Sequence, residues 1–209
     1  MKRTLKQLEA IVGTLSAPSK MPCHGYSTPA ARCKVGSKLR KDSNSTCASC
    51  YAAKGRYLFP NVQNAMERRF HSLANLNLWT TTMTELIGRK EKSGYFRWHD
   101  SGDLQSVEHL DAIATIATNL PDIQFWIPTR EYKFVKQWKE LHGNFPSNLM
   151  VRMSAYFKGQ PATMKDQPSS TVGWSESKHE CPSRHQNNMC GSCRACWDPK
   201  VLNVDYPLH

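Results

Sequence analysis

The stretch YFRWHDSGDLQSVEHLDAIATIATNLPDIQFWIPTREYKFVKQWKELHGNFPSNLMVRM, residues 95–153, carries the clearest pattern in the chain. Three short segments rich in aromatic and β-branched residues are strand candidates: 95–98, 123–127 and 148–153. Between them, apolar residues recur at helical spacing from Leu104 to Ile116 and from Phe134 to Leu141. Alternating strands and helices at this spacing predict right-handed βαβ units and a parallel sheet.

The segments outside this core are less regular. Residues 61–92 read as helix with a break near Asn77, and residues 4–12 as a short basic helix. Residues 157–178 are polar and predict a surface loop, whereas the apolar end 201–204 predicts an edge strand. We therefore expect an α/β fold, a truncated, TIM-like barrel with cysteine-rich, loop-rich segments at both ends.

The expected domain organisation is simple. A basic N-terminal segment, residues 1–20, precedes one iron–sulfur α/β domain, residues 21–209. Within that domain we distinguish three parts: a first cysteine group in 21–60, a βα core in 94–156 and a second cysteine group in 178–198.

Composition narrows the class of protein. The 209-residue chain has no apolar run long enough to cross a membrane and begins with no convincing signal peptide, which predicts a cytoplasmic protein. Eight cysteines in such a chain, several in C-x-x-C pairs, favour metal ligation over a disulfide framework.

The C-terminal cysteines give the sharper signal. Their spacing is Cys181-x8-Cys190-x2-Cys193-x2-Cys196. The last three follow each other at three-residue steps, as in the bacterial ferredoxin run that wraps a 4Fe–4S cluster. Zinc is the alternative at these four cysteines, although zinc sites more often pair two C-x-x-C turns across a longer gap.

The N-terminal cysteines are Cys33, Cys47 and Cys50, with Cys23 ten residues further upstream. Cys23 is either a fourth ligand or a free thiol, and we favour the free thiol. Three thiolates would leave one iron of a 4Fe–4S cluster open to a cofactor or substrate, whereas a fourth would close it. The chain is thus expected to hold one or two clusters.

Polar residues follow each predicted strand. In parallel α/β folds, ligands bind beyond the carboxyl ends of the strands. The residues that we expect to line a cofactor or substrate site there are His99, Asp100, Asp103, Thr129, Arg130 and Glu131. Some of them have a simpler use as helix N-caps, which accounts for about one residue at each strand end.

A basic surface near the first cysteine group predicts an anionic partner. The formal net charge is +11, and Lys34, Lys38, Arg40 and Lys41 stand close together in the sequence. These residues could contact a nucleic-acid backbone or another anionic partner. They could equally solvate a loop and offset the charge of a cluster.

Four motifs resemble the bacteriophage "gene product eighty-eight" family. They are CASCYAAKGRY (47–57), FRWHDSGDL (96–104), PTREY (128–132) and CGSCRACW (190–197). The resemblance covers nearly the whole chain from about Lys20 onward and implies a phage origin, in the cytoplasm of an infected host cell.

A more distant resemblance is to the radical S-adenosylmethionine enzymes, in particular the spore-photoproduct-lyase-like branch. A cysteine loop ending in C-x-x-C precedes βα units, and Gly-Asp at 102–103 and Thr-Arg at 129–130 fall where that branch also keeps polar residues. The resemblance implies S-adenosylmethionine as a cofactor. The family's compact C-x3-C-x2-C is replaced here by a first gap of thirteen residues.

Three functions follow from these observations. The first is an enzyme of radical S-adenosylmethionine type that acts on an anionic substrate. The second is a non-catalytic, metal-dependent protein that binds nucleic acid or a host factor. The third is an electron carrier.

Overall fold

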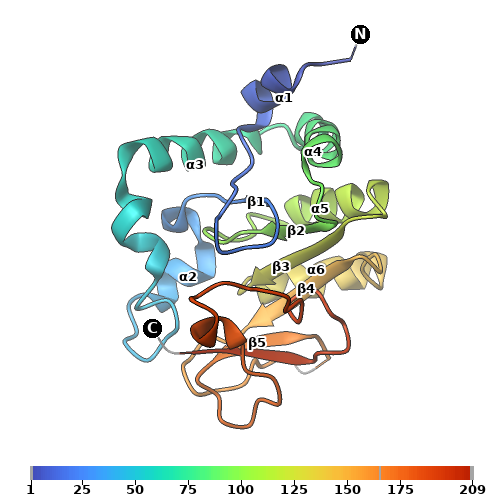
Figure 1. Cartoon of the computed structure of the whole chain (residues 1–209). Coiled ribbons are helices and arrows are strands. Elements are labelled where there is room, and N and C mark those ends of the chain that lie inside the picture. Colours follow the sequence, from blue (N-terminus) through green and yellow to red (C-terminus); the bar gives the residue numbers. More distant parts are fainter. Residues whose placement is uncertain (1, 165, 208–209) are drawn as a thin grey trace.

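The computed structural model describes residues 2–164 and 166–207. Its centre is one open sheet of six parallel strands in the order β1-β2-β3-β4-β5-β6, so that each strand pairs with its neighbour in the sequence. The strands are β1 (Gly25–Tyr26), β2 (Tyr95–Trp98), β3 (Gln124–Thr129), β4 (Leu149–Ser154), β5 (Ser169–Val172) and β6 (Asn203–Tyr206). Figure 1 shows the sheet running from β1, near the N-terminal helices, to β5 at the opposite end of the molecule.

The helices connect these strands. They are α1 (Leu5–Val12), α2 (Lys34–Leu39), α3 (Pro60–Ser72), α4 (Leu76–Lys90), α5 (Val107–Asn119) and α6 (Tyr132–His142). Short 3-10 turns are η1 (Ala30–Arg32), η2 (Tyr51–Ala53), η3 (Gly55–Leu58) and η4 (Pro182–His185). Two of the α-helices begin at ordinary N-caps: the side chains of Asn75 and Ser106 accept hydrogen bonds from backbone N–H groups at the starts of α4 and α5.

The sequence pattern is confirmed in the middle of the chain and corrected at its ends. Strands at β2, β3 and β4 and the parallel α/β class are confirmed. The sheet is open, so a closed barrel is absent from the described residues. The predicted edge strand is β6, shifted to 203–206.

The sequence pattern did not predict three elements, β1, α2 and β5. The segment 157–178, expected as a loop, contains β5, and the loop-rich segment 21–60 contains β1 and α2. β1 has two residues and β5 has the sequence SSTV, so neither shows the alternation that marks a strand. Both strands exist because neighbouring strands supply their hydrogen bonds.

The sheet has two unlike faces. Side chains alternate along a strand, so β3 points Phe125 and Ile127 to one face and Trp126 to the other. The first, which we call the helix-covered face, belongs to the main hydrophobic core with residues of α1, α4, α5 and α6. The second, the cysteine-covered face, carries a smaller cluster of four buried residues, Cys23, Trp126, Met150 and Trp197.

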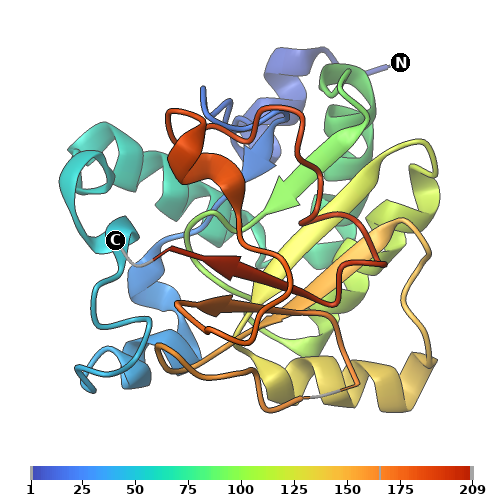
Figure 2. The same cartoon turned by 60° about the horizontal axis from the view of Figure 1, so that its bottom comes forward.

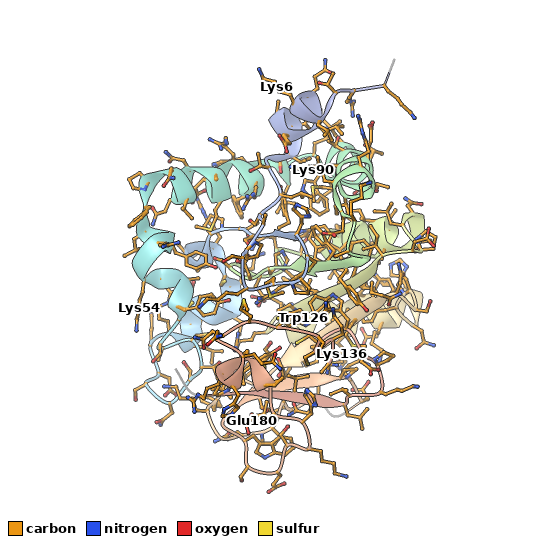
Figure 3. The ribbon with its side chains drawn as sticks, viewed as in Figure 1. Lys6, Lys54, Lys90, Trp126, Lys136 and Glu180 are labelled. Atoms are coloured by element: carbon orange, nitrogen blue, oxygen red, sulfur yellow. The ribbon has the colours of Figure 1, made fainter. Side chains whose placement is uncertain are left out.

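The C-terminal segment covers the second face. Figure 2 shows the chain between β5 and β6, orange to red, crossing the sheet on the side turned away from α5. The indole Nε1 of Trp197 donates to the carbonyl of Phe96 on β2 at 3.0 Å, and its ring lies 5.2 Å from that of Trp126 on β3. Trp126 lies near the middle of the molecule in Figure 3.

Candidate metal centres

The first thiol group consists of Cys33, Cys47 and Cys50. Cys33 is the N-cap of α2, and Cys50 directly precedes η2. Gly36 on α2 leaves room for them: a Cβ there would lie 3.1 Å from Cβ of Cys33 and 3.5 Å from Sγ of Cys47. Burial above all raises the pKa of Cys33, and the nearby Asp103, Cys50 and Cys47 raise it further. The three thiols therefore lie in one region, close enough for Cys47 and Cys50 to act on the pKa of Cys33.

Backbone contacts hold this group at the carboxyl ends of β3 and β4. Glu131, just after β3, accepts the N–H of Val35 in the first turn of α2 through Oε1 at 2.8 Å. The N–H of Thr46 donates to the carbonyl of Tyr156, just after β4, at 2.9 Å. A buried carboxylate thus fixes α2, and the strand end fixes the loop that carries Cys47.

Asp103 and Thr129 join the ends of two strands. Oδ1 of Asp103 accepts from the hydroxyl of Thr129 at 2.6 Å and from the N–H of Leu104 at 2.8 Å, and Oδ2 accepts from the N–H of Arg130 at 2.9 Å. Burial raises the pKa of Asp103, while these bonds act in the opposite direction. Both oxygens have protein donors, so this carboxylate organises the loops beside Cys33.

Arg130 and Asp100 retain polar atoms for a ligand. The Nε of Arg130 donates to the carbonyl of Ala155 at 3.3 Å, and the guanidinium partly offsets the burial that raises the pKa of Cys47. Oδ2 of Asp100 accepts from the hydroxyl of Tyr57 at 2.8 Å, and its carbonyl accepts from the hydroxyl of Tyr51. The buried Oδ1 of Asp100 has no partner in the described part of the chain.

His99 lies apart from the other predicted site residues. It is 3% exposed, has a positive φ of 55°, and its ring lies 5.5 Å from that of His109 on α5. Burial above all lowers the pKa of His99 well below its usual value, so the ring is neutral at pH 7. The two rings pack beside Trp98 and Trp79 of the main core.

The second thiol group has five members: Cys23, Cys181, Cys190, Cys193 and Cys196. Burial raises the pKa of Cys190 most, and Cys181 and Cys193 raise it further. Sγ of Cys196 lies 3.1 Å from the hydroxyl of Tyr206, and that of Cys193 lies 4.0 Å from Nε2 of His179. Cys23, which the sequence left between ligand and free thiol, lies beside Cys190 rather than with the first group. All eight cysteines are described, and none forms a disulfide.

Two arginines on the cysteine-covered face were missed by the sequence analysis. Arg152 of β4 is fully buried and donates to the carbonyls of Ala195, Cys196 and Asp198 at 2.7 to 2.9 Å. It therefore fixes the turn that carries Cys196. The available signal was a charged residue inside the otherwise apolar strand LMVRMS.

Arg97 is likewise a charged residue inside a strand, β2, whose sequence is YFRW. Its guanidinium lies 4.6 Å from the ring centre of Trp126 and 3.7 Å from Sδ of Met21. Burial lowers its pKa, but the nearby Tyr51, Asp100, Tyr206 and Cys196 outweigh burial and raise it. The buried Nε has no hydrogen-bond partner among the described residues. Arg97 therefore lies near the second thiol group and near Asp100, with a donor to spare in the described part of the chain.

The predicted basic surface lies on and just after α2. Lys34 and Lys38 are exposed and one turn apart, and Nζ of Lys34 lies 5.4 Å from the ring centre of Phe134. Lys41 is exposed as well, whereas Arg40 has a buried Nε without a partner in the described chain. Contact with nucleic acid stays a prediction.

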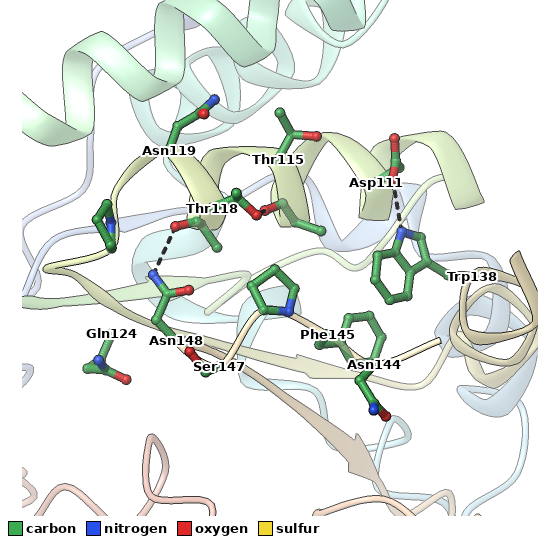
Figure 4. A pocket seen from close by; sticks show the side chains of 14 residues that line it. Asp111, Thr115, Thr118, Asn119, Gln124, Trp138, Asn144, Phe145, Ser147 and Asn148 are labelled. Atoms are coloured by element: carbon green, nitrogen blue, oxygen red, sulfur yellow. Dashed lines mark hydrogen bonds between the residues drawn. The ribbon is translucent and has the colours of Figure 1, made fainter. Parts of the chain in front are cut away.

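A pocket lies at the other end of the strands. Figure 4 shows it between α5 and the starts of β3 and β4, with Trp138 donating to Asp111 at 3.1 Å. Nδ2 of Asn148 donates to three carbonyls there, those of Ala117, Leu120 and Ile123. Its lining contains no cysteine, so it is separate from both thiol groups.

The geometry of the thiols bears on the kind of metal. Among residues 2–164 and 166–207, no group of three or more His, Cys, Asp or Glu side chains meets as a site for a single metal ion. In a 4Fe–4S cluster each thiolate binds a different iron, so the sulfurs surround a body several ångströms across. Thiolates are the ligands that iron–sulfur clusters use, and a cluster at these thiols stays a prediction.

Fold and site together define a parallel α/β protein with one thiol group at the carboxyl edge of its sheet and a second on one face. The family description "Gene product 88" matches residues 2–199, and the chain belongs to this phage family. The predicted family is confirmed; the likeness to radical S-adenosylmethionine enzymes has no support from this match. No curated protein and no solved structure matches the chain. In the part of the chain that the structure describes, no helix is long and apolar enough to cross a membrane.

Proposed function

We propose that this protein is an iron–sulfur enzyme whose first thiol group holds a 4Fe–4S cluster with one open iron, at which S-adenosylmethionine binds. The observation that carries the proposal is a count of thiols. Three lie at the carboxyl ends of the strands, and the remaining five, Cys23 included, belong to the other group. Three thiolates leave one iron of a cubane without a protein ligand, whereas an electron carrier uses four.

The surroundings of the first group suit the amino-acid end of this cofactor. The Arg130 guanidinium beside Cys47 is a partner for a carboxylate. Oδ1 of Asp100, which has no partner in the described chain, is an acceptor for an ammonium. When bound, the reduced cluster would supply one electron and a coordination position. The protein's own part is to hold the thiols, through Glu131 and Thr46, and to present these charged groups.

The sheet topology supports the same class. The six parallel strands follow one another in sequence order, as the strands of a (β/α) barrel do, but the sheet is open. In such folds ligands bind at the carboxyl ends of the strands. The predicted partial barrel remains part of this proposal. An anionic substrate is supported by Arg97, which lies near Tyr51 and Asp100 and whose Nε has no partner among the described residues.

Anaerobic protein tests the proposal through the cluster's own spectrum. We expect a brown protein whose reduced electron paramagnetic resonance signal changes when S-adenosylmethionine is added. Cys50→Ser should abolish the response to the cofactor, since the first cluster loses a ligand. Cys193→Ser, in the other group, is the matched control and should keep it. A colourless zinc protein, or an iron-loaded protein whose spectrum ignores the cofactor, would contradict the proposal.

A further inference from the structure

Cys23 lies in the segment between α1 and β1, far in sequence from the other members of the second thiol group. It is 8% exposed and belongs to the small buried cluster with Trp126, Met150 and Trp197 on the cysteine-covered face. Cys196 packs against the same cluster. Cys23 is therefore inside the molecule, on the face that the C-terminal cysteines cover.

The chain just before Cys23 runs alongside Cys190. The N–H of Cys190 donates to the carbonyl of Lys20 at 3.0 Å, and its Sγ lies 3.7 Å from Sδ of Met21. Burial above all raises the pKa of Cys23 to about 12, and Glu91 and Cys190 raise it further, while Arg97 and Arg194 act against them. The segment just before Cys23 is thus joined to Cys190, which lies 169 residues beyond Met21.

Packing alone does not explain this arrangement. A buried cysteine can serve as a small apolar side chain, and Cys23 does contact apolar neighbours. Yet the Arg97 guanidinium lies close enough to act on Cys23, Cys190 and Cys196 together. Asp100 supplies one counter-charge to the Arg97 guanidinium. Thiolates around a cluster would add negative charge on the side of Cys23 and Cys190.

We propose that Cys23 is a ligand of the second metal centre, so that this centre joins the N-terminal segment to the C-terminal one. The inference rests on the proposed iron–sulfur function and adds a ligand to it. The second thiol group has five members, whereas a 4Fe–4S cluster takes four. Cys23 would therefore replace one of the four C-terminal cysteines that the sequence spacing suggested as ligands.

Iron content and the cofactor response separate this inference from the proposed function. Cys23→Ser and Cys23→Ala should lose about half of the iron of the wild-type protein, one cluster of two, and keep the spectral response to S-adenosylmethionine. Met21→Leu, which changes the side chain that touches Cys190 and Arg97, is the matched control and should keep all of the iron. Full iron in either Cys23 variant would overturn the inference while leaving the first centre untouched.

A second measurement covers the case in which the variants are insoluble. In the wild-type protein, a chelator should make Cys23 and Cys190 accessible to an alkylating reagent at the same rate, as followed by mass spectrometry. Alkylation of Cys23 at a rate independent of iron would overturn the inference. If the wild-type protein takes up no iron at all, the proposed function fails first and this inference fails with it.

Discussion

The two faces of the sheet are stabilised by different kinds of interaction. On the helix-covered face, Phe96, Phe125 and Ile127 are fully buried among residues of four helices. On the cysteine-covered face, the next residues along the same strands are Arg97 and Trp126, and each has a buried N–H without a partner among the described residues. Apolar burial is sufficient for the first face. Unpaired donors occur on both faces, since Nε1 of Trp98 on the helix-covered face also has no partner among the described residues. The second face differs in its thiols, and under the proposed function its stability depends on the metal that they bind.

The largest expected effect concerns the helix-covered face. Phe125→Ala removes a ring that lies 5.7 Å from that of Phe96 and 6.3 Å from that of Trp98. We expect the free energy of unfolding to fall by about 3–5 kcal/mol, the usual result of emptying a buried aromatic position. Anaerobic urea denaturation measures it. The loss should be equal in iron-loaded and iron-free protein, and a loss that depends on iron would show that the two faces are coupled.

Removal of iron should act on the other face. Because a ligand that binds only the native state stabilises it by mass action, we expect chelation to lower the free energy of unfolding by about 3–4 kcal/mol. Hydrogen exchange should quicken in residues 20–23 and 190–197, with α5 unchanged. Equal quickening on both faces would contradict the division, and no change anywhere would mean that iron does not contribute to folding.

The smallest expected effect, taken per pH unit, is a pH dependence of the helix-covered face. Burial lowers the pKa of His109 from 6.5 to about 3, and that of His99 is also depressed. Below pH 6.5 the two histidines bind protons in the unfolded chain but not in the folded chain. The free energy of unfolding therefore falls as the pH falls from 6.5 towards 3. The expected slope is about 1.4 kcal/mol per pH unit for each histidine.

His109→Asn tests this slope, since an amide oxygen at that position can still accept the N–H of Gln105 as Nδ1 of His109 does at 3.3 Å. Urea denaturation between pH 6 and pH 4 should show about half of the histidine contribution in the variant. Parallel curves for the variant and the wild-type protein would mean that His109 titrates alike in the folded and unfolded chain.

The sequence predicted the elements that carry a strong local pattern. β2, β3, β4 and the helices between them show clear periodicity, because each buries one regular face. β1 and β5 have no such pattern, since a strand of two to four residues derives its structure from its neighbours. Long-range pairing of this kind cannot be read from a local window.

The candidate site was predictable in its residue types rather than in its grouping. The C-x-x-C spacings predicted thiol ligands, and the polar strand ends predicted a site at the carboxyl edge of the sheet; both stay predictions. The position of Cys23 depends on how a segment near residue 20 packs against one near residue 190, which no local spacing encodes. The hydrogen bond between Asp103 and Thr129 was also not predictable, because it joins two strand ends that are 26 residues apart in the sequence.

The contact between Met21 and Cys190 bears on the order in which the two thiol groups can form during synthesis. The three cysteines of the first group lie within one short stretch, 33–50, and are synthesised almost together. Cys23 is synthesised early, but Cys190 follows only when nearly the whole chain has been made. Domains acquire structure from the N-terminus onward during synthesis. We therefore expect the second centre to receive its iron only after translation ends, with the exposed thiol of Cys23 vulnerable to oxygen until then; pulse labelling with iron during synthesis would follow that delay.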